Sequence, residues 1–150
     1  SGFRSETMSL HGEYDDQNIF AKIIRGEAPC VKIFEDDVAI AFMDLFPQST
    51  GHCLVVPKEP ARNLLELSED AAAEAMKRVK ALAGAVEKAL QPDGVTVVQF
   101  NGAPAGQTVF HIHIHVIPQW EGKDLKGHGN SGKADEGELS ELADKIKAAL

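Results

Sequence analysis

A long alanine-rich helical pattern lies in the middle of the chain, with strand-like segments on both sides of it. Ser68 is a suitable N-cap, and strong helix formers follow it to about Leu90. Segments rich in β-branched and aromatic residues flank this helix at residues 31–36, 38–44, 52–57, 95–101 and 109–118. Because the strands are grouped before and after one helix rather than alternating with helices, we predict an α+β domain with a five-stranded antiparallel sheet.

Two shorter helices are predicted near the ends of the chain. Residues 18–27 begin at a possible N-cap asparagine, and residues 138–150 carry apolar residues at helical spacing. We expect residues 1–17 to be a disordered leader or added residues outside the fold. Residues 18–150 are expected to form a single domain with a C-terminal helical tail. The polar, glycine-rich residues 122–137 are expected to form a mobile loop.

The composition argues against several classes of partner. The chain has a formal net charge of −8, whereas nonspecific binding to nucleic acid requires many Lys and Arg residues to neutralise phosphates. It has no apolar run of about 18 residues and no signal-peptide pattern, so we expect no membrane association. The two cysteines, Cys30 and Cys53, form no disulfide framework and suit a reducing compartment. We therefore predict a cytoplasmic protein.

Three histidines alternate with isoleucine in the segment GQTVFHIHIHVIP, residues 106–118. In a strand, His111, His113 and His115 would share one face, with neighbouring imidazoles about 6.6 Å apart along the row. The residues between them would pack on the other face. Imidazoles this close together predict either a metal site or a site of proton and nucleophile chemistry.

Three hypotheses for this histidine row are open at this point. The alternation could be a structural coincidence. The row could bind zinc or another divalent ion, because histidines at i and i+2 of a strand can chelate one metal, with Asp or Glu completing the ligands. Alternatively, one imidazole attacks a phosphorus atom while its neighbours hold protons and negative charge, since imidazole titrates near neutrality.

The loop NGAPAGQT, which directly precedes the row, favours attack at phosphorus. Its glycines let the backbone approach a ligand closely and expose N–H groups, and its Gln and Thr add further donors. A metal hydrolase needs no such loop. We therefore predict that this loop forms a phosphate cradle, with Asn101, Gly102, Gly106, Gln107 and Thr108 as the candidate residues.

These motifs together resemble the histidine triad (HIT) family. GQTVFHIHIHVIP is similar to the family signature, in which three histidines alternate with apolar residues and two further apolar residues follow. NIFAKIIRGEAP, FEDDVAIAFMDLFPQSTGHCLVVPK and NGAPAGQTVF also resemble the family, so the resemblance covers about residues 18–118. The presence of the third histidine favours the bacterial nucleotide phosphoramidase branch over uridylyltransferases, which have glutamine there.

The resemblance also implies a role for each candidate site residue. His113 would be the nucleophile and form a nucleotidyl-histidine intermediate, His115 would contact phosphate oxygens, and His111 would help to hold His113. His52 would line the site, and Asp44 would hydrogen-bond the ribose hydroxyls. The residues expected to wall the base pocket are Ile19, Phe20, Ile23, Phe42 and Leu45.

The chain departs from the family pattern where many bacterial members carry a zinc-binding C-x-x-C pair. Asn18 and Ala21 occupy those two positions here. Glu59 and Pro60 likewise stand where many members have a histidine. We therefore expect no bound metal and no cofactor.

The expected activity is hydrolysis at the α-phosphate of a nucleotide. The resemblance implies cleavage of the P–N (or P–O) bond of purine nucleoside monophosphoramidates, which are AMP or GMP derivatives. A diadenosine polyphosphate hydrolase and a non-catalytic nucleotide-binding regulatory module remain as alternatives. The expected partner, besides the nucleotide, is a second copy of the chain, because family members form homodimers with a continuous sheet.

Overall fold

The computed structural model describes residues 10–125 and 132–150. Its elements are α1 (Ile19–Ile24), β1 (Lys32–Glu35), β2 (Ala39–Met43), β3 (Cys53–Pro57), α2 (Glu69–Leu90), β4 (Gly94–Val98), the short 3₁₀ helix η2 (Ala103–Ala105), β5 (Ile114–Gln119) and α3 (Glu136–Ala149). The five strands form one antiparallel sheet in the order β1-β2-β3-β5-β4. This arrangement confirms the predicted α+β class. Residues 126–131 of the predicted mobile loop lie outside the described residues.

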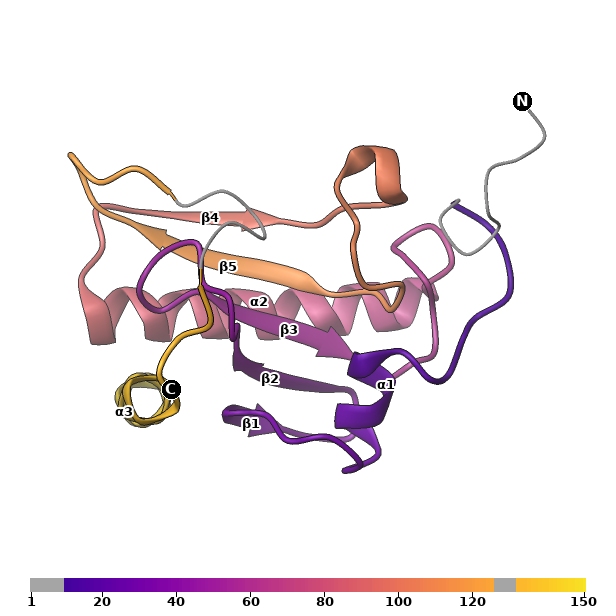
Figure 1. Cartoon of the computed structure of the whole chain (residues 1–150), viewed down its shortest axis with the longest axis horizontal. Coiled ribbons are helices and arrows are strands. Elements are labelled where there is room, and N and C mark those ends of the chain that lie inside the picture. Colours follow the sequence, from indigo (N-terminus) through magenta and orange to yellow (C-terminus); the bar gives the residue numbers. More distant parts are fainter. Residues whose placement is uncertain (1–9, 126–131) are drawn as a thin grey trace.

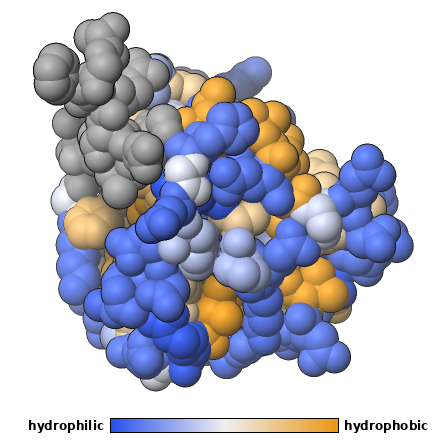
Figure 2. Space-filling model, turned by 90° about the vertical axis from the view of Figure 1, so that its right-hand side faces the viewer, coloured by the Kyte–Doolittle hydropathy of each residue, from blue (hydrophilic) through white to orange (hydrophobic). Residues whose placement is uncertain are grey.

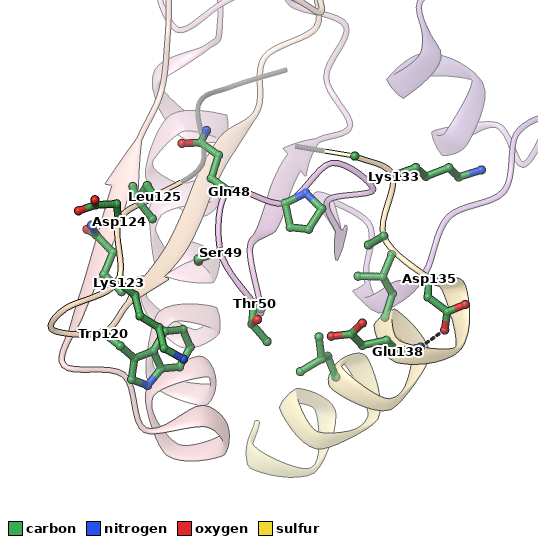
Figure 3. A pocket seen from close by; sticks show the side chains of 17 residues that line it. Gln48, Ser49, Thr50, Trp120, Lys123, Asp124, Leu125, Lys133, Asp135 and Glu138 are labelled. Atoms are coloured by element: carbon green, nitrogen blue, oxygen red, sulfur yellow. Dashed lines mark hydrogen bonds between the residues drawn. The ribbon is translucent and has the colours of Figure 1, made fainter. Parts of the chain in front are cut away.

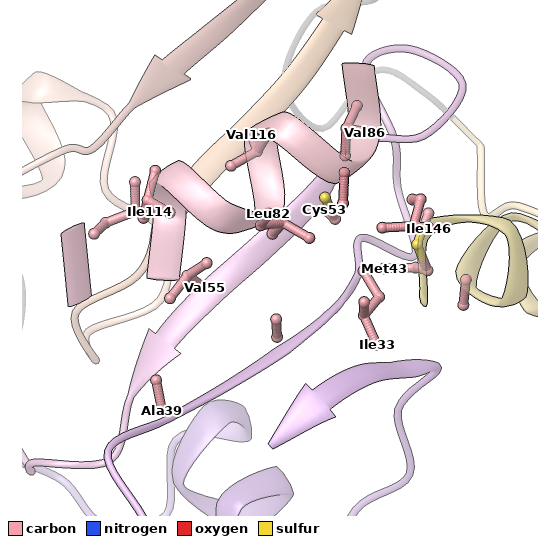
Figure 4. Packing of buried hydrophobic residues seen from close by; sticks show 14 of the residues in the cluster. Ile33, Ala39, Met43, Cys53, Val55, Leu82, Val86, Ile114, Val116 and Ile146 are labelled. Carbon is pink, nitrogen blue, oxygen red and sulfur yellow. The ribbon is translucent and has the colours of Figure 1, made fainter. Parts of the chain in front are cut away.

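The main core lies between one face of the sheet and the helices α2 and α3 (Figures 1 and 4). Val55 and Ile114 contribute to it from the sheet, Leu82 from α2 and Ile146 from α3. Leu82 and Ile146 are fully buried, and burying a side chain of this size contributes about 1.5–3 kcal/mol. With both long helices on this face, the opposite face is left for the candidate site.

The opposite face of the sheet carries α1 and a second apolar cluster. Phe42 of β2 is paired with Leu54 of β3, and Leu54 is paired with His115 of β5. Directly paired residues point to the same face of a sheet, so His115 lies in a row with these two apolar residues. Phe20 of α1 packs edge-on against Phe42, with ring centroids 5.6 Å apart. The sheet thus brings the histidine motif and the helix α1 to one face.

Helix α2 begins at the predicted N-cap. The Ser68 hydroxyl accepts a hydrogen bond from the backbone N–H of Ala71 at 3.2 Å. The carboxylate of Glu59 accepts hydrogen bonds from the Ser68 N–H and hydroxyl, each at 2.7 Å. Glu59, which stands near the place of a family histidine, therefore stabilises the start of this helix.

The prediction of a strand over residues 109–118 is wrong for its first half, because β5 begins only at Ile114. The β3–β5 register would place Ile112 opposite Pro57, and proline has no N–H to donate to a ladder. The N–H of Ile112 instead bonds to the carbonyl oxygen of Ala61 at 2.9 Å. Consequently His111 and His113 precede the strand, and only His115 belongs to it.

Residues 10–17, the described part of the expected leader, lie against the domain. The buried side chain of Asn63 donates to the Leu10 carbonyl oxygen at 2.8 Å, and the buried guanidinium of Arg62 donates to the Glu13 carbonyl oxygen at 3.2 Å. The Tyr14 hydroxyl reaches the ring of His111. This segment therefore has defined contacts with the histidine motif, while residues 1–9 lie outside the described part of the chain.

Candidate active site

A cleft of about 430 Å³ lies on the α1 face of the sheet, between α1, β2 and the histidine motif. Asp44, Thr108, His113 and His115 line it. The predicted base-pocket residues also line it, namely Ile19, Phe20, Ile23, Phe42 and Leu45. Figure 2 looks at the end of the molecule that carries α1 and shows apolar residues emerging between hydrophilic ones. The structure thus gathers an apolar wall and two of the three motif histidines around one cavity.

His113 has a defined orientation in this cleft. Its Nδ1 lies 2.7 Å from the backbone carbonyl oxygen of His111, so the carbonyl accepts a hydrogen bond from Nδ1–H. The neutral ring then carries its lone pair on Nε2. Phe20 packs edge-on against the ring, with centroids 4.8 Å apart, and limits its rotation. The lone pair of a neutral His113 therefore lies on Nε2, and the residue lines a pocket with an apolar wall.

His115 is oriented by a chain of hydrogen bonds that begins at the backbone. The Gln48 N–H donates to Nδ1 of His52 at 3.0 Å, so the proton of a neutral His52 lies on Nε2. This Nε2 is 2.9 Å from Nδ1 of His115 and donates to it. His115 then carries its own proton on Nε2, and its ring centroid is 5.1 Å from that of His113. A hydrogen-bond donor therefore lies beside the ring of His113.

Asp44 lies at the edge of the same network. One carboxylate oxygen accepts the N–H of Phe46 at 2.8 Å, and the other is 3.4 Å from Nε2 of His52. The side chain retains 14% exposure and lines the cleft. It thus lies beside the apolar wall of the cleft, and its contact with ribose hydroxyls stays a prediction.

Asp44, His52 and His115 also form a group whose possible ligand atoms lie within 4.8 Å of one another. A metal-binding histidine normally donates a hydrogen bond through the nitrogen that does not hold the metal. His52 does the opposite, because its Nδ1 accepts the Gln48 N–H and its Nε2 keeps the proton. This donor set does not suit a metal ion, and the three motif histidines themselves do not converge on one point.

His111 does not line the cleft. It is 1% exposed, and both of its ring nitrogens are hydrogen-bonded. Nε2 donates to the carbonyl oxygen of Pro57 at 2.7 Å, and Nδ1 accepts the hydroxyl of Tyr14 at 2.5 Å. Burial lowers the pKa of His111 below its ordinary value and raises that of Tyr14, so both groups are neutral. Sequence reasoning missed Tyr14, because it lies in the segment expected to be a leader.

Three residues predicted for the phosphate cradle do not line the cleft. The buried carboxamide of Gln107 accepts the Gly102 N–H at 2.8 Å and donates to the carbonyl oxygens of Arg62 and Val109. Asn101 accepts the Leu64 N–H at 2.9 Å. Gly106 ends η2 with a φ of 112°, a conformation that favours glycine. The side chains of Asn101 and Gln107 and the backbone of Gly106 hold the shape of the loop that presents Thr108. A cradle role for these three residues stays a prediction.

A larger cleft of about 640 Å³ lies elsewhere, between the loop after β2, the segment after β5 and the start of α3 (Figure 3). Its lining includes Lys123 and Lys133 but also Asp124 and Glu138, so its walls carry charges of both signs. None of the motif histidines lines it. The chemistry predicted from the sequence therefore belongs to the cleft beside α1.

Comparison with protein families agrees with this geometry. The model of the HIT domain matches residues 25–122, which include the three histidines and all five strands of the sheet. The chain belongs to the HIT family. The matched region contains the motif whose residues His113 and His115 line the cleft.

Two curated members of the family show the extent of the likeness. Adenosine 5′-monophosphoramidase hnt1 of Schizosaccharomyces pombe is 45% identical over 101 residues, which cover 67% of this chain and 73% of that protein. Adenylylsulfatase HINT3 of Arabidopsis thaliana is 38% identical over 138 residues, which cover 88% of this chain and 68% of that protein. Both alignments extend over at least two thirds of each sequence.

Solved structures show the same fold. A crystal structure of a Hit-like protein from Bartonella henselae, described as involved in cell-cycle regulation and as holding an unknown ligand, superposes with a TM-score of 0.88 at 48% identity. The match covers 93% of this chain and all of that one. The likeness therefore extends over nearly the whole chain.

Proposed function

We propose that this HIT protein is a nucleotidyl hydrolase that cleaves the P–N (or P–O) bond at the α-phosphate of purine nucleoside monophosphoramidates. The observation that carries the proposal is the orientation of His113, whose Nδ1 proton is held by the His111 carbonyl oxygen at 2.7 Å. In the neutral ring the lone pair then lies on the opposite nitrogen, and the residue lines a cleft with an apolar wall. Such a nitrogen is a competent nucleophile at neutral pH.

The reaction takes two displacements at phosphorus. Nε2 of His113 attacks the α-phosphorus, a P–N bond forms to the histidine, and the bond to the leaving amine breaks. The leaving nitrogen takes up a proton from solvent, and the exposed hydroxyl of Thr108 at the cleft is suited to pass it on. Water then attacks the nucleotidyl-histidine, which releases the nucleoside monophosphate and restores the neutral ring.

The neighbouring groups serve the transition states of both steps. Negative charge builds on the nonbridging phosphate oxygens, and a fixed donor stabilises it without reorganising. His115 offers its Nε2 proton for this purpose, since His52 occupies its Nδ1. The carbonyl oxygen of His111 also stabilises the positive ring of His113 while it is bonded to phosphorus.

The walls of the cleft support a purine nucleotide as the ligand. The apolar side chains of α1 and β2 bury a flat base, and the Asp44 carboxylate offers an acceptor for ribose hydroxyls. The names of the two curated relatives, a monophosphoramidase and an adenylylsulfatase, support hydrolysis of adenosine nucleotides. One name points to a nitrogen leaving group and the other to an oxygen leaving group. The geometry of this site does not distinguish between the two.

The homodimer and the cytoplasmic location are part of the same proposal. β4 is the last strand of the sheet, has β5 as its neighbour on one side, and exposes Val97 on its surface. An open edge of this kind can pair with a second copy.

Within the described part of the chain, no helix has the length and apolar character that a membrane span requires.

The proposal is tested by release of AMP from adenosine 5′-phosphoramidate by protein dialysed against a chelator. We expect full activity without added metal and a loss of more than about 1,000-fold in His113→Ala. Activity that appears only after zinc is restored would refute the nucleophile assignment and return the histidines to the metal hypothesis. Tight AMP binding by wild-type protein without turnover would instead support the non-catalytic regulatory module. Preferred cleavage of diadenosine polyphosphates would support the diadenosine polyphosphate hydrolase.

A further inference from the structure

The segment before α1 makes one contact that the proposed reaction does not use. Tyr14 lies directly after Glu13, whose backbone carbonyl is held by the buried guanidinium of Arg62. On its other side, the Asn18 side chain donates to the Asp15 carbonyl oxygen at 2.8 Å. The backbone is thus fixed on both sides of Tyr14, and its hydroxyl is directed to Nδ1 of His111 at 2.5 Å.

The position of His111 is not fixed by the sheet. β5 begins at Ile114, so no ladder hydrogen bond holds residue 111. Its ring is held instead by the Pro57 carbonyl oxygen at 2.7 Å and by the Tyr14 hydroxyl. The Tyr14 and His111 rings also meet edge-on, with centroids 5.7 Å apart. The peptide group that carries the His111 carbonyl is also held by the Ile112 N–H, which donates to the Ala61 carbonyl oxygen at 2.9 Å. The backbone of His111 is therefore held by this bond together with the two ring contacts.

The backbone of His111 in turn orients His113, because its carbonyl oxygen accepts the Nδ1 proton at 2.7 Å. We propose that Tyr14 is a positioning residue for the catalytic histidine, acting through His111. The inference rests on the proposed role of His113, and it makes the N-terminal segment part of the site. Tyr14 holds His111 in the neutral form with its proton on Nε2, and thereby holds the carbonyl that selects the tautomer of His113.

The first test reads the tautomers without any substrate. Tyr14→Phe keeps the ring against His111 and removes only the hydroxyl. Glu13→Gln is the matched control, because Arg62 bonds to the backbone of Glu13 and not to its exposed carboxylate. We expect Tyr14→Phe to shift the imidazole ¹⁵N signals of both His111 and His113, and Glu13→Gln to leave them unchanged. Signals of His113 that do not move in Tyr14→Phe overturn the proposal.

The second test measures turnover of adenosine 5′-phosphoramidate by the same variants. The loss of one hydrogen bond in the chain that orients the nucleophile is expected to lower kcat about 5- to 10-fold. KM should stay within about two-fold, because Tyr14 does not line the cleft. An unchanged kcat, or a matching rise in KM, contradicts the proposal. If wild-type protein does not turn over, the proposed function fails, and the ¹⁵N signals alone decide the role of Tyr14.

Discussion

His113 donates its Nδ1 proton to the backbone carbonyl oxygen of His111, two residues earlier in the chain, across 2.7 Å. The two histidines therefore act in different ways. His113 offers its ring to the cleft, while the ring of His111 is buried and hydrogen-bonded through both nitrogens. Alternation in the sequence made these residues look equivalent, and their partners in the fold distinguish them.

The hydrogen bond between His52 and His115 predicts a graded effect of substitution. His52→Leu removes the donor to Nδ1 of His115, which then no longer holds its proton on Nε2. We expect kcat to fall about 10-fold or more, because losing one well-oriented hydrogen bond in the transition state raises the barrier by about that factor in rate. His52→Gln can still donate from its amide and should recover much of this loss. Equal activity of the two variants would show that orientation of His115 is unimportant.

The burial of His111 predicts how stability depends on pH. Its pKa in the folded protein is lowered by burial from an ordinary value of 6.5. Below that value the unfolded chain takes up a proton that the folded protein does not bind, so the free energy of unfolding falls as the pH is lowered through 6.5 and below. Urea unfolding at a series of pH values should show this slope. In His111→Gln the slope should be smaller, and an unchanged slope would mean that other groups cause it.

Two glycines predict stability changes of opposite sign. Gly51 has a φ of +94°, and a Cβ built there would lie 2.3 Å from Cδ1 of Leu90. Gly51→Ala should therefore destabilise the fold by about 1–2 kcal/mol, mainly through the strained backbone. Gly84 lies within α2, and a Cβ there meets nothing within 4 Å. Gly84→Ala should stabilise it by about 0.5–1 kcal/mol. Thermal unfolding of both variants checks the pair, and changes of the same sign would refute this account.

Much of the fold could be predicted because local signals agreed with tertiary contacts. The serine at position 68 caps α2 as its type predicts, and the apolar spacing of α3 is that of a helix packed on the core. The apolar residues of α1 and β2 were assigned to a base pocket, and they line the cleft. Secondary-structure periodicity is informative where one face of an element is buried and the other is not.

The parts that were missed depend on partners far away in the sequence. The motif strand was predicted too long, because the missing N–H of Pro57 that ends the ladder lies on another strand. The buried pair of Tyr14 and His111 joins residues 97 positions apart. Nothing in the polar residues around Tyr14 indicates such a contact. The roles of Asn101 and Gln107 in holding their own loop likewise follow from backbone partners that spacing does not reveal.

The central claim is covalent catalysis by His113, and the most direct measurement is a search for the nucleotidyl-histidine itself. Wild-type protein is mixed with adenosine 5′-phosphoramidate, quenched rapidly at alkaline pH to preserve the P–N bond, digested and analysed by mass spectrometry. The account predicts an adenylyl group on His113 that is absent from the His113→Ala sample. Release of AMP at full rate with no adenylyl group on the protein, or with the group on a different residue, would contradict it.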